Sequence, residues 1–127
     1  VEPAVIAKYN VVSAPVAARM ALGAAAASGA DIAVSVTGVA GPTGGDEVRP
    51  VGTVYLGAAR GDTVYVQKLF VSRPDRALVR ARAAQAALAL ALRLAQGKVP
   101  AHTKPLAASE QHSAAALDAL NEAFLAE

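Results

Sequence analysis

The residues best suited to chemistry lie in a glycine-rich stretch near the middle of the chain. Residues 34–45 read VSVTGVAGPTGG, so an apolar, β-branched run passes directly into a loop that contains four glycines. Glycine tolerates positive φ and lets the backbone approach a ligand, so N–H groups of such a loop can converge on an anion or an oxyanion. A flexible surface turn is the alternative, and composition alone favours neither.

Thr37 stands where the predicted strand ends, which is the position where open α/β sheets place ligands. Its hydroxyl and the N–H of Gly38 could hold a nucleotide or stabilise an oxyanion. Alternatively, Thr37 ends the strand with a local bond to the backbone. The stretch GVAGPTGG does not fit the dinucleotide motif G-x-G-x-x-G, and no Gly-Lys-Ser/Thr follows as in a Walker loop.

A second group of candidates lies downstream. Arg76 and Arg80 are four residues apart and share a helical face. Arginine forks suit bidentate contact with phosphate, although two solvated surface arginines are the common alternative. Asp75 is better suited to the positive end of a helix than to acid catalysis. His102 and His112 lack Cys or acidic partners at ligand spacing, so we expect no metal site.

Helices and strands that alternate along the chain must position these residues. Ser13 should cap a helix that ends at Gly29, and its apolar stripe is predicted to be Val16, Met20, Ala24 and Ala27, with Arg19 on the other face. A second helix should begin at Pro74 and Asp75 and end at Gly97. The expected strands are Asp31–Val36, Val51–Ala59 and Thr63–Val71, of which the last two read as a hairpin.

The fold class predicted from these elements is α/β, a three-layer sheet flanked by helices. The first strand is apolar at nearly every position, as is typical of a strand covered on both faces. Residues 1–12 are expected to be a short lead-in from an incomplete element. Residues 101–108 read as a linker, and residues 110–125 have the amphipathic spacing of a terminal helix that docks on the domain or on a neighbouring subunit.

Composition limits the classes of partner. The 127 residues are 54% hydrophobic and only 4% aromatic, so the core must be built from small aliphatic side chains. A net charge of +2 is too small to predict direct nucleic-acid binding. No apolar run reaches the ~20 residues of a membrane span. Because there is neither such a run nor any cysteine, we expect a cytoplasmic protein without membrane contact.

The stretch from Asp31 to Gly57, DIAVSVTGVAGPTGGDEVRPVGTVYLG, resembles the C-terminal domain of the competence/damage-inducible protein CinA. That family carries a TGIAGPGGGT..KPVGTVYIG signature, which here reads Thr37–Gly45 followed by Arg49–Tyr55. Residues 9–13, YNVVS, are similar to the family's YGAVS, and residues 72–80 are similar to its GDR..VR helix start. The resemblance covers roughly residues 1–94.

Stand-alone domains of this family are nicotinamide-nucleotide amidases, so the resemblance implies hydrolysis of nicotinamide mononucleotide to nicotinate mononucleotide and ammonia. It implies a nucleotide substrate, a homo-oligomer and no metal or organic cofactor. Thr37 and Gly38 would serve catalysis. The substrate-binding residues implied are Thr37, Gly38, Ala40, Gly41, Gly44, Gly45, Arg76 and Arg80.

This sequence departs from the family pattern in one respect. The family's domain begins with a strand and helix bearing ESCTGG, whose serine is the nucleophile, and a tyrosine and a lysine follow; none of these motifs occurs here. We therefore expect a partial amidase domain over residues 1–97, inactive alone, and a linker with an amphipathic helix over residues 98–127. The alternative is a non-catalytic interaction module that contacts recombination proteins.

Overall fold

The computed structural model describes residues 1–73 and 75–126. Pro74, predicted to open the second long helix, lies outside the described residues. The elements in chain order are α1 (Pro3–Tyr9), α2 (Ala14–Ser28), β1 (Ile32–Gly38), β2 (Thr53–Arg60), β3 (Thr63–Phe70), α3 (Arg76–Ala95), β4 (Lys104–Ala107), the short 3-10 turn η1 (Ala108–Glu110) and α4 (Ala114–Leu125).

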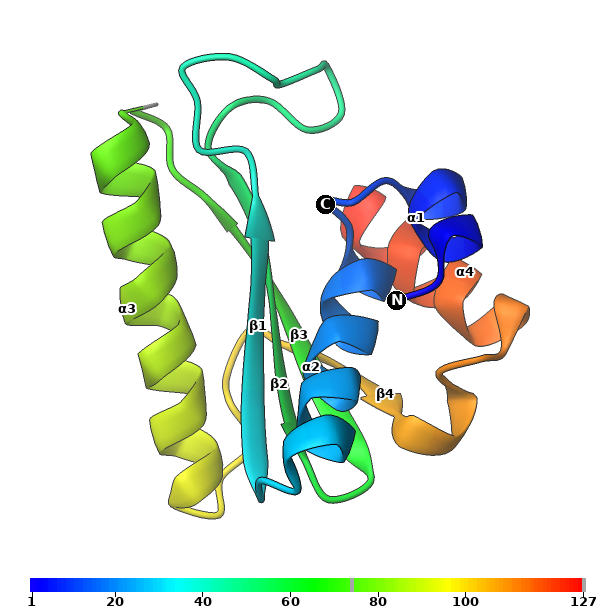
Figure 1. The fold of residues 1–127 in the computed structure, drawn as a ribbon. Helices are drawn as coiled ribbons and strands as arrows, with labels where there is room; N and C mark the ends of the chain where they lie inside the picture. Colours follow the sequence, from blue (N-terminus) through cyan, green and yellow to red (C-terminus); the bar gives the residue numbers. More distant parts are fainter. Residues whose placement is uncertain (74, 127) are drawn as a thin grey trace.

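The strands form one antiparallel sheet in the order β1-β2-β3-β4. Helix α3 covers one face, and α2 and α4 cover the other (Figure 1). The three-layer α/β prediction is therefore confirmed, and the predicted hairpin is β2–β3, whose turn contains Gly61 at a φ of 62°. No helix within residues 1–73 and 75–126 is both long enough and apolar enough to cross a membrane.

Local capping signals fix where the helices begin and end. The Ser13 hydroxyl accepts a hydrogen bond from the N–H of Val16 at 3.4 Å, and Gly29 ends α2 at a φ of 70°. The Asp75 carboxylate accepts from the N–H groups of Ala77 and Leu78 at 2.8 and 3.3 Å, so Asp75 is the cap that its position suggested.

The core has two clusters, one on each face of the sheet. The larger cluster depends on a close approach of α2 to the sheet. The hydroxyl of Ser35 on β1 donates to the carbonyl oxygen of Ala17 at 2.6 Å. A Cβ placed on Gly57 of β2 would lie 2.5 Å from that same carbonyl oxygen. The alanines of α2 allow this short distance, because larger side chains would hold the helix away from the strands.

The apolar stripe predicted for α2 is correct at its N-terminal end and wrong at its C-terminal end. Val16 is buried, Met20 is half-buried, and Ala24 and Ala27 are exposed. Alanines on the neighbouring face take the sheet contact instead. Arg19 is only 9% exposed, and its guanidinium lies 2.7 Å from the Glu2 carboxylate.

Strand β1 has a helix on each face, as its apolar sequence predicts: α2 packs on one face and α3 on the other (Figure 1). It is an edge strand, hydrogen-bonded to β2 alone within the described residues. Its cover on the α3 side is partial, because Val34 and Val36 are 38% and 40% exposed.

The segment after α3 contains a strand that was not predicted from the sequence. β4 pairs with β3, with Pro105 opposite Tyr65, and a proline is tolerated there because β4 is an edge strand. Helix α4 packs on α2 and buries Leu117, Leu120 and Phe124. The segment expected to be a linker thus widens the sheet.

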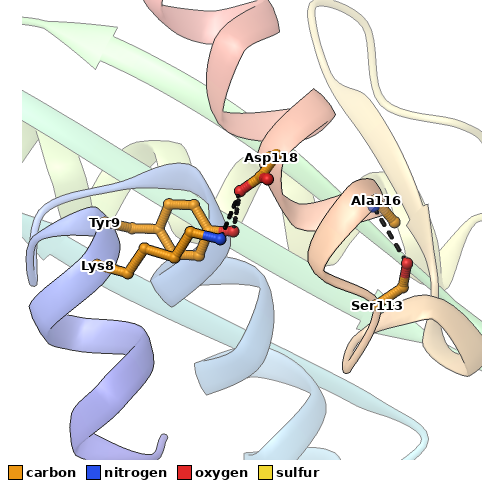
Figure 2. A network of polar contacts seen from close by, with 5 residues as sticks. All are labelled: Lys8, Tyr9, Ser113, Ala116 and Asp118. Atoms are coloured by element: carbon orange, nitrogen blue, oxygen red, sulfur yellow. Dashed lines mark hydrogen bonds and ion pairs between the residues drawn. The ribbon is translucent and has the colours of Figure 1, made fainter.

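Helix α1, in the region expected to be a lead-in, is fastened to α4 by a polar network (Figure 2). The Tyr9 hydroxyl donates to Asp118, whose carboxylate also lies 3.0 Å from the Lys8 ammonium. These two partners lower the pKa of Asp118, while burial raises the pKa of Tyr9. The network joins the two ends of the described chain.

Replacing Gly57 with alanine should be destabilising, because the new methyl group would overlap the Ala17 carbonyl and push α2 from the sheet. We expect the free energy of unfolding in urea to fall by about 1–3 kcal/mol. Gly23→Ala is the matched control: its Cβ would meet no atom within 4 Å, and alanine favours a helix interior. Equal stabilities of the two variants would contradict the close approach.

The Glu2–Arg19 pair predicts a pH dependence of stability. The hydrogen bond from Arg19 lowers the pKa of Glu2 from 4.5 to about 2. A depressed carboxyl pKa stabilises the fold above about pH 4.5, and this contribution is lost as the pH falls toward about 2. The thermal midpoint of the wild type should therefore fall more steeply over that range than that of Glu2→Gln. Glu47→Gln, in an exposed loop, should follow the wild type; parallel wild-type and Glu2→Gln curves would exclude this role.

Candidate functional site

A groove lies where the end of β1, the start of the glycine loop and the first turns of α3 meet. Its volume is about 310 Å³, and it is lined by Val36, Gly38, Ala40, Val54, Val79, Arg80, Ala83 and Ala84. The floor is apolar, and Arg80 is the charged member of the lining. An apolar floor beside a cation suits a ligand with a flat ring and a negative group.

The glycine loop is held in a folded conformation rather than left as an open turn. The N–H of Val39 donates to the carbonyl of Thr53 at 2.9 Å, and the N–H of Gly52 donates to the carbonyl of Val39 at 2.8 Å. Gly41 has a φ of 83°, which side chains rarely adopt. A Cβ on Gly45 would lie 2.6 Å from the backbone nitrogen of Val51. Glycine is therefore required by the fold of the loop itself.

Arg76 and Arg80 both reach the region of the groove. The Arg76 guanidinium donates to the carbonyl of Gly41 at 3.1 Å and so joins the start of α3 to the loop. Arg80 lies one turn further along and lines the groove. Of the predicted substrate-binding residues, the structure brings together Gly38, Ala40, Gly41, Arg76 and Arg80.

Thr37, Gly44 and Gly45 do not line this groove. The side chain of Thr37 points to the opposite face of the sheet, where its hydroxyl donates to the carbonyl of Val11 at 2.8 Å, and the residue is 9% exposed. Gly44 and Gly45 lie further along the loop, where Gly45 packs against the backbone of Val51. The roles assigned to these three residues stay predictions.

Arg49 supports the loop of the candidate site, and the sequence analysis did not single it out. Its guanidinium donates to the carbonyls of Val12 and Tyr9 at 2.5 and 2.8 Å, and so fastens the outer loop to the connection between α1 and α2. The Asp46 carboxylate accepts from the N–H of Arg49 at 2.6 Å and closes the turn before it. Its position before Pro50 in the quoted signature was the sign of Arg49 in the sequence. Its contact with Val12 joins residues that are 37 positions apart, and no local pattern predicts such a contact.

A second cavity, of about 340 Å³, lies between α1, α2 and α4 and includes Lys8, Arg19 and His112 in its lining. Its charges are paired within the protein, Lys8 with Asp118 and Arg19 with Glu2. We therefore assign these residues to packing of the terminal segments. Among the described residues, no group of three His, Cys, Asp or Glu side chains could hold a metal ion.

Sequence and structure comparisons agree on one family. The family described as CinA C-terminal domain matches residues 1–95. A "CinA-like protein" of Geobacter sp. (strain M21) is 50% identical over 80 residues, which are 63% of this chain and 19% of that protein. The "Nicotinamide-nucleotide amidohydrolase PncC" of Enterobacter agglomerans is 44% identical over 93 residues, 73% of this chain and 57% of that protein.

Solved structures show the same relationship. The competence/damage inducible protein CihA from Agrobacterium tumefaciens matches with a TM-score of 0.72 at 34% identity, over 76% of this chain and 59% of that one. A CinA superfamily protein from Escherichia coli matches with a TM-score of 0.69 at 35% identity, over 74% and 54%. The chain thus spans about a fifth of the CinA-like protein and less than two thirds of the amidohydrolase.

Removing the Arg49 side chain should loosen the loop without unfolding the sheet. Arg49→Ala loses two charge-assisted hydrogen bonds, so we expect about 1–2 kcal/mol less stability. Amide hydrogen exchange over residues 39–52 should become faster, while β2 and β3 stay protected. Arg73→Ala, at an exposed position, is the control. Unchanged exchange in the loop would show that Arg49 does not hold it.

Proposed function

Because the chain belongs to the CinA C-terminal domain family, we propose that it forms part of an amidohydrolase that deamidates nicotinamide mononucleotide to nicotinate mononucleotide and ammonia. One relative is named a nicotinamide-nucleotide amidohydrolase, which supports amide hydrolysis as the class of reaction. Other relatives are named only CinA-like.

The observation that carries the substrate proposal is the groove beside β1. Its apolar floor of Val36 and Val54 can take a pyridine ring, and its rim presents Arg80, with Arg76 one turn earlier at the Gly41 carbonyl. A guanidinium fork recognises phosphate by two parallel N–H···O bonds. A nucleotide would therefore lie with its ring toward β1 and its phosphate toward the start of α3.

In the proposed reaction, a serine hydroxyl attacks the carboxamide carbon, ammonia leaves, and water hydrolyses the resulting acyl-enzyme to the acid. The serine would be contributed from outside this chain. The part of the reaction assigned here is to hold the nucleotide, and we assign stabilisation of the oxyanion to the N–H of Gly38. The chain alone is then expected to bind substrate without turning it over.

The alternative role, an interaction module for recombination proteins, is favoured by no specific contact. An exposed apolar face on the terminal helix would have supported it. In α4 this face is turned inward, with Leu117, Leu120 and Phe124 each less than 9% exposed. We therefore place the amidohydrolase proposal first.

Phosphate recognition can be tested by calorimetric binding on the chain itself. Nicotinamide mononucleotide should bind more tightly than nicotinamide riboside, which lacks the phosphate. Arg80→Ala should weaken binding of the nucleotide by roughly tenfold, since a charged hydrogen bond contributes about 1.5–3 kcal/mol, and should leave the riboside unaffected. Arg82→Ala, an exposed α3 arginine outside the groove lining, is the control. Equal losses for both ligands would remove Arg80 from the phosphate site.

Catalysis needs a separate experiment. We would fuse to this chain the part of the Enterobacter agglomerans amidohydrolase that has no counterpart here and measure ammonia release from nicotinamide mononucleotide. The fusion should be active and the chain alone inactive, and Arg80→Ala should raise the KM of the fusion. A folded fusion that binds the nucleotide but releases no ammonia would overturn the amidase proposal while leaving the binding site in place.

A further inference from the structure

Tyr9 contacts both the terminal helix α4 and the support of the glycine loop. Its hydroxyl donates to the carboxylate of Asp118 on α4, while its backbone carbonyl accepts from the guanidinium of Arg49 at 2.8 Å. The residue is 5% exposed and belongs to the same core cluster as Leu117 and Leu120 of α4. A single buried residue therefore joins α4 to the arginine that fastens the loop.

The connection between α1 and α2 is held by bonds among its own residues. The side-chain oxygen of Asn10 accepts from the N–H of Val12 at 3.0 Å, and the hydroxyl of Ser13 donates to the carbonyl of Asn10 at 2.8 Å. Side-chain bonds of this kind fix a turn. The carbonyl of Val12 is the second acceptor for Arg49. A shift of Tyr9 would therefore displace both acceptors together.

The carboxylate of Asp118 holds the end of α1 by two groups. Figure 2 shows Lys8 and Tyr9 of α1 and Asp118 of α4 pointing toward one another. The Lys8 ammonium lies 3.0 Å from the carboxylate and 5.1 Å from the centre of the Tyr9 ring. Tyr9 is the buried residue of α1, so this network determines where the helix ends. A charged acceptor strengthens the bond from the hydroxyl.

We propose that Asp118 is a positioning residue for the candidate site, because it holds the glycine loop, residues 39–52, through Tyr9 and Arg49. The contacts run from α4 to the Tyr9 hydroxyl, and from the Tyr9 carbonyl through the guanidinium to the loop. The start of that loop carries Ala40, which lines the groove. Helix α4 thus acts on the groove without lining it. This inference rests on the proposed function for the identity of the ligand, but not for the contacts themselves.

The segment that carries Asp118 is itself anchored to the sheet. The family match covers residues 1–95, and β4 and α4 lie beyond it. Strand β4 pairs with β3, and directly after it the N–H of Ala108 donates to the carbonyl of Asp62 in the turn between β2 and β3 at 2.6 Å. The segment is therefore attached to β3 at one end and to α1 at the other, and can act as a brace between them.

Residue-resolved amide hydrogen exchange of the whole chain tests this role. Tyr9→Phe removes the hydroxyl and keeps the buried ring, and Asp118→Ala removes its acceptor. Each should speed the exchange of the bonded loop amides of Asp46 and Gly52 by roughly threefold, as expected for one hydrogen bond at a partly exposed charge. Amides of β2 and β3 should change less. Glu122→Ala removes an exposed carboxylate from the same helix and should match the wild type.

The route through Arg49 is tested by repeating Tyr9→Phe in an Arg49→Ala background. In that background the loop has lost its bond to the Tyr9 carbonyl, so Tyr9→Phe should leave the exchange of the loop unchanged. Additive effects of the two substitutions would overturn the proposal.

Two other exchange patterns would also overturn it. One is faster exchange in α1 and α4 with a loop that stays as in the wild type. The other is an equal increase in the loop and in β2 and β3, which would report a change in global stability alone. These measurements need no ligand, so a wild type that binds no nucleotide would contradict the proposed function and leave this inference standing.

Discussion

The contact between α2 and the sheet determines the position of the candidate site. Because Gly57 has no side chain, the carbonyl of Ala17 can come within hydrogen-bond distance of Ser35 on β1. This places the start of α2 above the end of β1, where Thr37 reaches the carbonyl of Val11 and Arg49 reaches that of Val12. The glycine loop is therefore anchored on the α2 side, and its inner half turns toward α3.

Most of the charged side chains around this framework have a polar partner within the protein. Asp75 caps α3, Arg76 takes a loop carbonyl, and the Lys8–Tyr9–Asp118 network closes α1 on α4. Arg80 differs from these, because it lines an apolar groove. A cation beside an apolar floor is a place where an anionic ligand can gain both ring burial and ionic contact.

Local chemistry could be predicted from the sequence, and long-range contacts could not. The caps at Ser13 and Asp75, the glycine loop and the hairpin each depend on residues close in the chain, so their patterns are readable. The grouping of Arg80 with Gly38 followed from the family signature rather than from spacing. The inward turn of Thr37, the Arg49 contacts and β4 depend on partners far along the chain, and no local pattern specifies them.

Periodicity identifies an apolar face but not what covers it. The stripe of Val16, Met20, Ala24 and Ala27 is real as a pattern, yet the sheet covers only its first member fully, since the smaller alanines beside it permit a closer approach. The apolar run of β1 behaves in the same way and remains exposed at Val34 and Val36. An apolar pattern therefore shows which face of an element gains by leaving water, while the tertiary contacts decide how many members of that face are covered.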